Sequence, residues 1–300
     1  VTPSSPTRRF QILSVSEIAE ATYPNGTVMT HFTGKVAVVT GAGSGIGRAL
    51  SVELARRGAK LAICDVDTVG LAETEGLVRA EGAEVKADHL DVSQRELVLA
   101  YADGVVEHFG TVNLVFNNAG IAFTGNVEDM SFKDMDRVMD VDFWGVVSGT
   151  KAFLPHLIAS GDGHIINISS IFGLFSVPTQ SAYNAAKFAV RGFTESLRME
   201  MIANKRPVKV LCVHPGGIKT NIARKAEQVE GLDHDHLAQQ FDKLARTSPA
   251  KAANVILKAV EKNKARVLIG ADAWVLDKFV RGTGPGYARA VGALSRRNGL

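Results

Sequence analysis

The sequence predicts an α/β fold, in which a single doubly wound domain holds a seven-stranded parallel sheet with helices on both faces. Three features favour this fold class: short apolar runs recur along the chain, helical patterns separate them, and glycines cluster directly after the first run. Continuous apolar strands that alternate with helices are typical of a parallel sheet buried on both faces. The chain of 300 residues is long enough for one such domain.

Seven apolar or β-branched runs are the predicted strands. They cover residues 35–40, 60–65, 84–91, 112–119, 164–170, 208–215 and 265–270. No linker and no internal repeat interrupts the series. Strands of this type, with helices between them, predict one Rossmann-type domain over residues 35–270.

Two of the intervening helices show where they begin or end. In IGRALSVELARRG, Ile46, Leu50 and Leu54 recur on one face, and Gly58 follows as the C-terminal stop. In SPAKAANVILKAVEKN, Ser248 is the predicted N-cap and Pro249 takes the first helical position. Both patterns support helices between the predicted strands.

Three segments lie outside this regular alternation. Residues 1–34 form an N-terminal extension that we expect to be flexible, with Met29 as a candidate natural start. Residues 221–247 are polar and charged, and we expect them to form a lid over the substrate. Residues 271–300 form a C-terminal tail with a terminal helix that ends in the basic pair Arg296 and Arg297. This helix either lies in solvent or packs across a neighbouring subunit.

The composition excludes several classes of protein. A hydrophobic content of 46% and a charged content of 22% are typical of a globular protein, and a net charge of +3 is too small to indicate nucleic-acid binding. No apolar run is long enough for a membrane span, and the first residues lack the pattern of a secretory signal. Cys64 and Cys212 lie in apolar runs, which predicts buried side chains and no disulfide or metal site. We therefore expect a cytoplasmic protein.

A glycine-rich turn follows the first predicted strand. In TGAGSGIG (40–47), missing side chains allow a pyrophosphate to approach the backbone, and the next helix offers free amide donors and the positive end of its dipole. The strand before and the helix after this run predict a dinucleotide site, with a glycine turn that binds nothing as the alternative. The residues expected to bind cofactor here are Gly41, Ser44, Gly45, Ile46 and Gly47.

Asp65 ends the second predicted strand, where an acidic residue can accept hydrogen bonds from both hydroxyls of the adenosine ribose. A carboxylate would repel the 2′-phosphate of NADP, and the neighbours Ser44 and Val66 supply no cation for it. The sequence therefore predicts NAD as the cofactor in preference to NADP. Simple solubility at a strand end is the alternative for Asp65.

Tyr183 and Lys187 lie four positions apart in SAYNAAKFAV, on one face of a predicted helix. Taken alone, such a pair is usually a solvated surface feature. A free tyrosine has a pKa of about 10, and both a nearby ammonium and the positive nicotinamide of NAD⁺ favour its ionised form. The pair therefore predicts a tyrosine whose pKa is lowered toward neutral pH, as general acid–base catalysis requires.

Four motifs in fixed order resemble the short-chain dehydrogenase/reductase family in its compact single-domain branch: TGAGSGIG, NNAG (117–120), Ser170 and the Tyr183–Lys187 pair. The resemblance covers about residues 35–270. It implies that Ser170 holds the substrate oxygen, that Tyr183 is the general acid–base, and that Lys187 binds the nicotinamide ribose and lowers the tyrosine pKa. It also implies further cofactor contacts at Asp91, Val92, Asn118, Ala119, Gly120, Pro215, Ile218 and Thr220.

Asp142 is the one departure from the family pattern, which has asparagine at this position. In the family that asparagine acts partly through its backbone carbonyl, which helps to hold a water in a proton relay. Because the substitution keeps the carbonyl, we retain Asp142 among the catalytic residues. The added charge puts the efficiency of the relay in question, and not the reaction class.

The resemblance implies an NAD-dependent oxidoreductase that interconverts a secondary alcohol and a ketone. Ile121, Phe172 and Phe175 either wall an apolar pocket for a steroid-, terpenoid- or lipid-like substrate or pack as core or subunit interface. The helices expected over 142–158 and 182–203 carry small and apolar residues, which in the family form dimer or tetramer contacts. A regulator that senses NAD without turnover, and an epimerase or dehydratase on the same fold, are the alternatives.

Overall fold

The computed structural model describes residues 30–220, 222, 226–229 and 245–297. The predicted extension up to residue 29 and most of the predicted lid lie outside these ranges. Within them, no helix is both long and apolar enough to cross a membrane.

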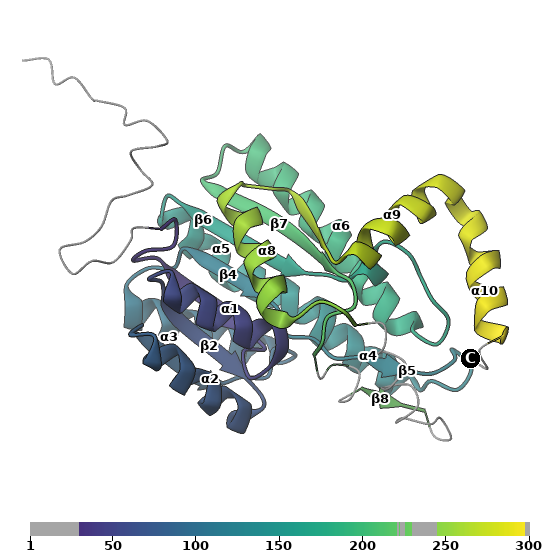
Figure 1. Cartoon of the computed structure of the whole chain (residues 1–300). Helices are drawn as coiled ribbons and strands as arrows, with labels where there is room; N and C mark the ends of the chain where they lie inside the picture. The colour runs from purple at the N-terminus through teal and green to yellow at the C-terminus, as the bar shows by residue number, and fades with distance from the viewer. Residues whose placement is uncertain (1–29, 221, 223–225, 230–244, 298–300) are drawn as a thin grey trace, which may run out of the picture.

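Seven parallel strands form the central sheet, as predicted, in the order β3-β2-β1-β4-β6-β7-β9 (Figure 1). The direction of winding reverses between β1 and β4, and ligands of such sheets bind outside the carboxyl ends of the strands at this point. The strands are β1 (Val36–Thr40), β2 (Lys60–Asp65), β3 (Val85–His89), β4 (Leu114–Asn117), β6 (Gly163–Ile168), β7 (Val208–Pro215) and β9 (Arg266–Ile269).

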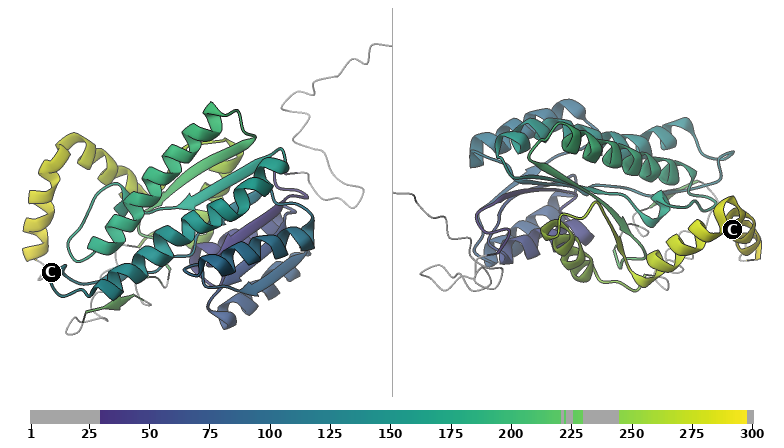
Figure 2. Two further views of the ribbon diagram at one scale, coloured as in Figure 1. Left: turned by 180° about the vertical axis from the view of Figure 1, so that it is seen from behind. Right: turned by 90° about the horizontal axis from the view of Figure 1, so that it is seen from above.

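Two layers of helices cover the sheet (Figure 2). One layer packs around Leu50 and Ile256, and its helices are α1 (Gly45–Arg56), α2 (Thr68–Ala80) and α8 (Pro249–Glu261). The other packs around Phe153 and Leu197, and its helices are α3 (Arg95–Phe109), α5 (Gly145–Ala159) and α6 (Ser181–Ala203). Alternate residues of each strand face opposite layers, which is why the strands read as continuous apolar runs.

The predicted helix ends are confirmed. The Ser248 side chain accepts a hydrogen bond from the Lys251 amide at 3.2 Å, and Pro249 is the first residue of α8. Gly58 adopts a φ of +78° and donates its amide to Ala55 O at 2.9 Å, which closes the end of α1. At both helix ends, the capping residues predicted from the sequence are therefore those found in the structure.

Several elements were not anticipated. A short helix, α4 (Phe132–Met139), continues into a π-helical turn, η2 (Asp140–Trp144), before α5. A second, two-stranded sheet pairs β5 (Phe123–Thr124) with β8 (Glu227–Gln228), although the segment that holds β8 shows no strand pattern. The predicted terminal helix is α10 (Tyr287–Arg297), and a further helix, α9 (Ala271–Thr283), precedes it. Figure 1 shows α9 and α10 as an arm at the end of the chain, with α10 standing away from the sheet.

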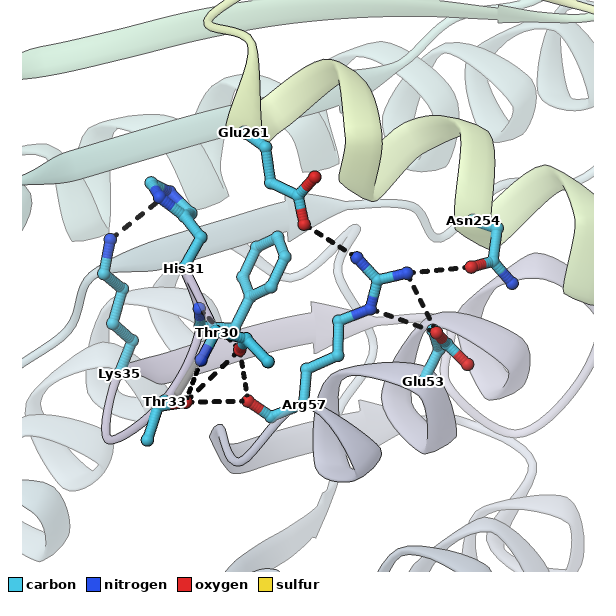
Figure 3. Close-up of polar contacts among 9 residues, drawn as sticks. Thr30, His31, Thr33, Lys35, Glu53, Arg57, Asn254 and Glu261 are labelled. Carbon is cyan, nitrogen blue, oxygen red and sulfur yellow. Dashed lines mark hydrogen bonds and ion pairs between the residues drawn. The ribbon is translucent and has the colours of Figure 1, made fainter. Parts of the chain in front are cut away.

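The described fold begins upstream of the predicted start of the domain. Phe32 is fully buried in the core, and the Arg57 guanidinium lies over its ring. Figure 3 shows Arg57 between the turn that holds Thr30 and the side chains of Glu53 and Glu261. The Thr30 hydroxyl donates to Arg57 O at 2.6 Å, while the Arg57 side chain pairs with Glu53 of α1 and Glu261 of α8. Arg57 therefore fastens the turn at 30–34 to both helices.

Candidate active site

The four candidate catalytic residues come from three elements and meet at the carboxyl edge of the sheet. Ser170 follows β6 and caps a short 3₁₀ helix, η3 (Ile171–Gly173). Tyr183 and Lys187 lie on the first two turns of α6, with Lys187 Nζ 5.4 Å from the centroid of the tyrosine ring. Asp142 lies in the π-helical turn η2. Ser170, Lys187 and Asp142 all act on the pKa of Tyr183, so the structure brings the predicted set together.

Asp142 and Lys187 form a buried ion pair that the sequence analysis missed. Asp142 Oδ2 lies 3.1 Å from Lys187 Nζ, and the two residues are 0% and 3% exposed. Asp142 Oδ1 accepts a hydrogen bond from the Ile121 amide at 2.7 Å, and Lys187 Nζ also donates to Ile168 O at 3.4 Å. The sequence predicted a role for the Asp142 backbone carbonyl and an effect of the added charge on the relay, whereas in the structure the carboxylate itself contacts the lysine.

The protein's own groups shift the pKa of Tyr183 upward, whereas the predicted downward shift also includes the positive nicotinamide of NAD⁺. Burial raises its pKa above the ordinary value, the ammonium of Lys187 lowers it, and the charge of Asp142 raises it again. For Lys187, burial lowers the pKa, but Asp142 and Tyr183 raise it, and the net direction is upward. The lysine therefore keeps its proton, while burial and the carboxylate outweigh its effect on the phenol.

His214 contacts the backbone of Ser170, the candidate catalytic serine, and was not anticipated. Its Nδ1 lies 2.8 Å from the Ser170 carbonyl oxygen, to which it can only donate, so its Nε2 faces Cys212 Sγ as an acceptor at 3.4 Å. Burial lowers the pKa of His214 to about 4, and the ring is neutral at physiological pH. The histidine before the proline of HPGGIKT was the signal available in the sequence.

The glycine-rich turn is shaped by close packing. Gly41 and Gly45 adopt φ values of +65° and +55°, and a Cβ on Gly47 would overlap with the carbonyl of Gly41. Ser44 is the N-cap of α1, and its side chain makes no capping hydrogen bond, so it leaves the first-turn amides to another acceptor. Ile46 is partly buried and packs against the core. These features fit a phosphate at the start of α1.

The end of β4 braces the glycine turn. The amides of Asn118 and Ala119 both donate to the Thr40 hydroxyl at 3.0 Å, and the Asn118 side chain donates to Thr40 O at 2.9 Å. A Cβ on Gly41 would lie 2.7 Å from Ala119 Cα. Thr40 is thus a positioning residue that sequence reasoning missed.

Asp65 lies beside the glycine turn, at the end of β2. Its two carboxylate oxygens accept hydrogen bonds from the amides of Gly43 at 2.7 Å and Asp67 at 2.8 Å. The structure also places a cation nearby, contrary to the expectation drawn from the neighbours in sequence. Arg48 contacts the Gly43 carbonyl, but its guanidinium is engaged in an ion pair with Glu73 at 2.8 Å.

The remaining candidate cofactor residues line the same edge of the sheet. Asp91 accepts a hydrogen bond from the Ser93 amide at 2.9 Å, and Val92 is buried. Gly120 lies next to the ion pair, since a Cβ there would be 3.3 Å from both Asp142 Oδ1 and Lys187 Nζ. On the exit from β7, which ends at Pro215, Ile218 is buried. Thr220 follows, and its Cγ2 lies 3.1 Å from the position of a Cβ on Gly45.

The candidate substrate residues fall into two groups. Phe172 packs edge-to-face on Tyr183, with ring centroids 6.3 Å apart, and Ile121 packs in a partly buried cluster that also contains Tyr183. Phe175 is only 4% exposed and packs beneath the C-terminal arm, against Ala273. Of the two alternatives, core packing describes Phe175, whereas Phe172 and Ile121 border the phenol.

A separate hollow of about 580 Å³ lies on the outer side of α6. Its apolar lining includes Val127, Val177, Pro178 and Phe188, and it contains none of the candidate catalytic residues. Cys64 and Cys212 are both unpaired and buried, as predicted. Among the described residues, no group of three or more His, Cys, Asp or Glu side chains is arranged to hold a metal ion.

Comparisons with known proteins give matches over most of the chain. A family model described as short chain dehydrogenase matches residues 35–231. The chain is 62% identical over 266 residues to the putative oxidoreductase SadH of Mycobacterium tuberculosis (strain ATCC 25618 / H37Rv), covering 88% of this chain and 96% of the relative. It is 34% identical to the uncharacterized oxidoreductase YxnA of Bacillus subtilis (strain 168), covering 80% of this chain and 66% of the relative.

Two solved structures extend the comparison. A short chain dehydrogenase/reductase from Burkholderia phymatum in complex with NAD has a TM-score of 0.79 at 32% identity, covering 85% of this chain and 95% of that one. Levodione reductase has a TM-score of 0.73 at 28% identity, covering 82% and 99%.

Proposed function

The chain belongs to the short-chain dehydrogenase/reductase family and is an oxidoreductase of that type. On that premise, we propose that it uses NAD to interconvert a secondary alcohol and a ketone, with Tyr183 as the general acid–base. The observation that carries this proposal is the meeting of Ser170, Tyr183 and Lys187 beside the glycine turn.

NAD is the cofactor that the site fits. The relative from Burkholderia phymatum binds it, and so does a short chain dehydrogenase from Mycobacterium paratuberculosis of 25% identity and TM-score 0.70. In this chain the first-turn amides of α1 would hold the pyrophosphate, Asp65 the adenosine ribose, and Lys187 the second ribose. The Arg48 guanidinium, already paired with Glu73, offers little to a 2′-phosphate. When bound, the nicotinamide accepts or supplies the hydride.

The protein's own part in the reaction is orientation and proton transfer. Ser170 donates a hydrogen bond to the substrate oxygen and holds it next to the Tyr183 hydroxyl. In the direction of reduction, the phenol gives its proton to that oxygen; in oxidation, the phenolate takes the proton from the alcohol. Lys187 keeps its ammonium charge and stabilises the phenolate form. His214 fixes the backbone at Ser170 and thereby the direction of the serine hydroxyl.

An apolar substrate is supported by the side chains around Tyr183. Phe172 packs on the phenol from one side, and the partly buried cluster with Ile121 and Met139 lies on another. We propose a bulky apolar alcohol or ketone, such as a steroid, terpenoid or lipid. Phe175 contributes indirectly, because it supports Phe172 at a ring distance of 5.5 Å.

The organisation of the chain is part of the proposal. We assign catalysis to residues 35–270, lid function to 221–247, and a cytoplasmic location to the protein. Apolar side chains on the outer sides of η2 and α6 favour a homodimer or homotetramer, since Trp144 and Phe188 are both exposed. Size determination in solution tests the oligomeric state.

A substrate screen tests the reaction class. Purified protein is mixed with NAD and a panel of apolar secondary alcohols, and the absorbance of reduced nicotinamide is followed. Accumulation of reduced cofactor with one class of alcohol supports the proposal. Tight NAD binding without turnover of any alcohol or ketone would instead favour a sensor, and product formed without net reduction would favour an epimerase or dehydratase.

A further inference from the structure

The proposed reaction requires the Lys187 ammonium but not the Asp142 carboxylate that is paired with it. A cation beside the phenol helps it to lose a proton, but an anion 3.1 Å from that cation cancels much of its field. A buried carboxylate is also costly unless it is paired. We therefore expect the carboxylate at position 142 to have a function separate from that of Lys187.

We propose that Asp142 is the counterion of Lys187 and that its charge holds Tyr183 in the protonated form at neutral pH, so that at this pH the site is poised for carbonyl reduction. The inference rests on the proposed function, because it concerns the proton that Tyr183 exchanges with the substrate. It makes Asp142 a positioning residue that acts through its neighbours.

The carboxylate is held rigidly in place. Its Oδ1 is fixed by the Ile121 amide at 2.7 Å, and its Oδ2 faces Lys187. Gly120 closes the third side, since a Cβ there would lie 3.3 Å from both Asp142 Oδ1 and Lys187 Nζ. Both partners are almost completely buried, so solvent screens their interaction little.

Asp142 has two effects on its neighbours. It keeps Lys187 charged, because a buried amine without a counterion tends to lose its proton. It also opposes ionisation of Tyr183, through its own negative charge and by cancelling the positive charge of the lysine. The lysine thus remains a donor for ribose hydroxyls, while its help to the phenolate is reduced.

Among the residues that the structure describes, the other groups that act on the pKa of Tyr183 or Lys187 carry no charge at neutral pH. Cys212 of β7 acts on the pKa of Lys187, and burial raises the pKa of its own thiol to about 12. His214 is neutral because burial lowers its pKa to about 4, and Ser170 is a hydroxyl. The titration of the site is therefore set by Asp142, Tyr183 and Lys187.

The consequence is a separation of the two directions by pH. Reduction uses the phenol and oxidation uses the phenolate, so a carboxylate that disfavours the phenolate should move the pH range of oxidation upward. The carboxylate leaves the overall equilibrium unchanged, because a catalyst cannot alter it. It changes the pH range in which Tyr183 is mainly in the protonation state that each direction of the reaction needs.

The first experiment compares the pH profile of alcohol oxidation in the parent and in Asp142→Asn. Removing the charge should move the apparent pKa of kcat/KM for oxidation to lower pH by about 1 to 2 units. Asp140→Asn removes the same charge two residues away, at an exposed position of the same π-helical turn, and should leave the profile unchanged.

A second experiment needs neither cofactor nor substrate. Ionisation of Tyr183 is followed by the ultraviolet absorbance of tyrosinate, with Tyr183→Phe subtracted to isolate its signal. The midpoint should be lower in Asp142→Asn than in the parent. In the double variant Asp142→Asn/Lys187→Met, which leaves no unpaired buried charge, the midpoint should return close to that of the parent.

The midpoint of Tyr183 ionisation tests the role of the Asp142 charge. A lower midpoint in Asp142→Asn alone supports the proposal, and an unchanged or higher midpoint overturns it. If Asp142→Asn does not fold, Asp142→Ser, which removes the same charge and keeps Lys187, takes its place. Its midpoint should likewise be lower than that of the parent, and no change would refute the role of the carboxylate. A different result, full turnover by Tyr183→Phe, would show that the proposed function itself is wrong.

Discussion

The Tyr287 hydroxyl accepts a hydrogen bond from the Ser176 amide at 3.0 Å, which ties the start of α10 to the loop that follows the catalytic serine. The ring of Tyr287 packs edge-to-face on Phe175, Phe175 on Phe172, and Phe172 on Tyr183. A continuous row of aromatic rings therefore connects the C-terminal arm with Tyr183, the proposed general acid–base.

Loss of the Tyr287 hydroxyl should loosen the substrate side of the site. In Tyr287→Phe the ring stays but the hydrogen bond is lost, at a cost of about 1 kcal/mol in loop order. We expect KM for the substrate to rise about threefold to fivefold, with kcat little changed. Steady-state kinetics measure both. Leu294→Ala, an exposed position on the same helix, is the control; an equal rise in KM there would contradict the role of the hydroxyl.

Removal of the Tyr183 hydroxyl should stop proton transfer. For Tyr183→Phe we expect kcat/KM to fall by about 10² to 10⁴, the usual contribution of a general acid–base, while NAD binding by calorimetry stays close to that of the parent. Tyr101→Phe removes a buried hydroxyl on α3, where the ring packs on Phe153, and the variant should keep the parent rate. Full activity in Tyr183→Phe would disprove the acid–base assignment.

The choice between NAD and NADP should depend on the charge of Asp65. Asp65→Asn keeps an acceptor for the Gly43 amide but no longer repels a 2′-phosphate. We expect the ratio of kcat/KM for NAD over NADP to fall by about tenfold or more, as for loss of one charge interaction. Combining it with Glu73→Gln, which frees Arg48, should lower the ratio further. An unchanged ratio in both variants would exclude Asp65 as the ribose contact.

Stability should fall with acidification because two histidines are buried in neutral form. Burial lowers the pKa of both His164 and His214 to about 4, well below the value in an unfolded chain. The unfolded state binds their protons first, so the free energy of unfolding is largest above about pH 6.5 and decreases toward pH 4. The expected loss is about 3 kcal/mol per histidine, measured by urea unfolding at several pH values. In His164→Gln the loss should be roughly halved; an identical pH dependence would refute this origin.

The sequence predicted those features that depend on local patterns. The apolar runs predicted all seven strands of the sheet, and the caps at Gly58 and Ser248 were confirmed. Helix α9 could also have been found, because Ala273, Leu276 and Val280 follow helical spacing and pack together against the loop after β6. This helix was not predicted because residues 271–300 were interpreted as a C-terminal tail with a single terminal helix.

What the sequence did not predict depends on contacts between distant segments. The π-helical turn brings Asp142 to a lysine 45 positions later in the chain, and no local pattern indicates that turn. The direction of the shift at Tyr183 follows from its burial and from that carboxylate, neither of which the Tyr-Lys spacing reveals. Arg48 reaches the turn beside Asp65 from a helix, so the neighbours of Asp65 in sequence gave no sign of it.

The attachment of the turn at 30–34 has a practical consequence. Arg57 and Lys35 fasten this turn at the amino ends of the strands, opposite the edge where Tyr183 and the glycine turn lie. A biotin or affinity tag attached on that side should leave the edge with Tyr183 and the glycine turn exposed to solvent. Immobilised in this way on a sensor chip, the protein should bind dinucleotides as it does in free solution.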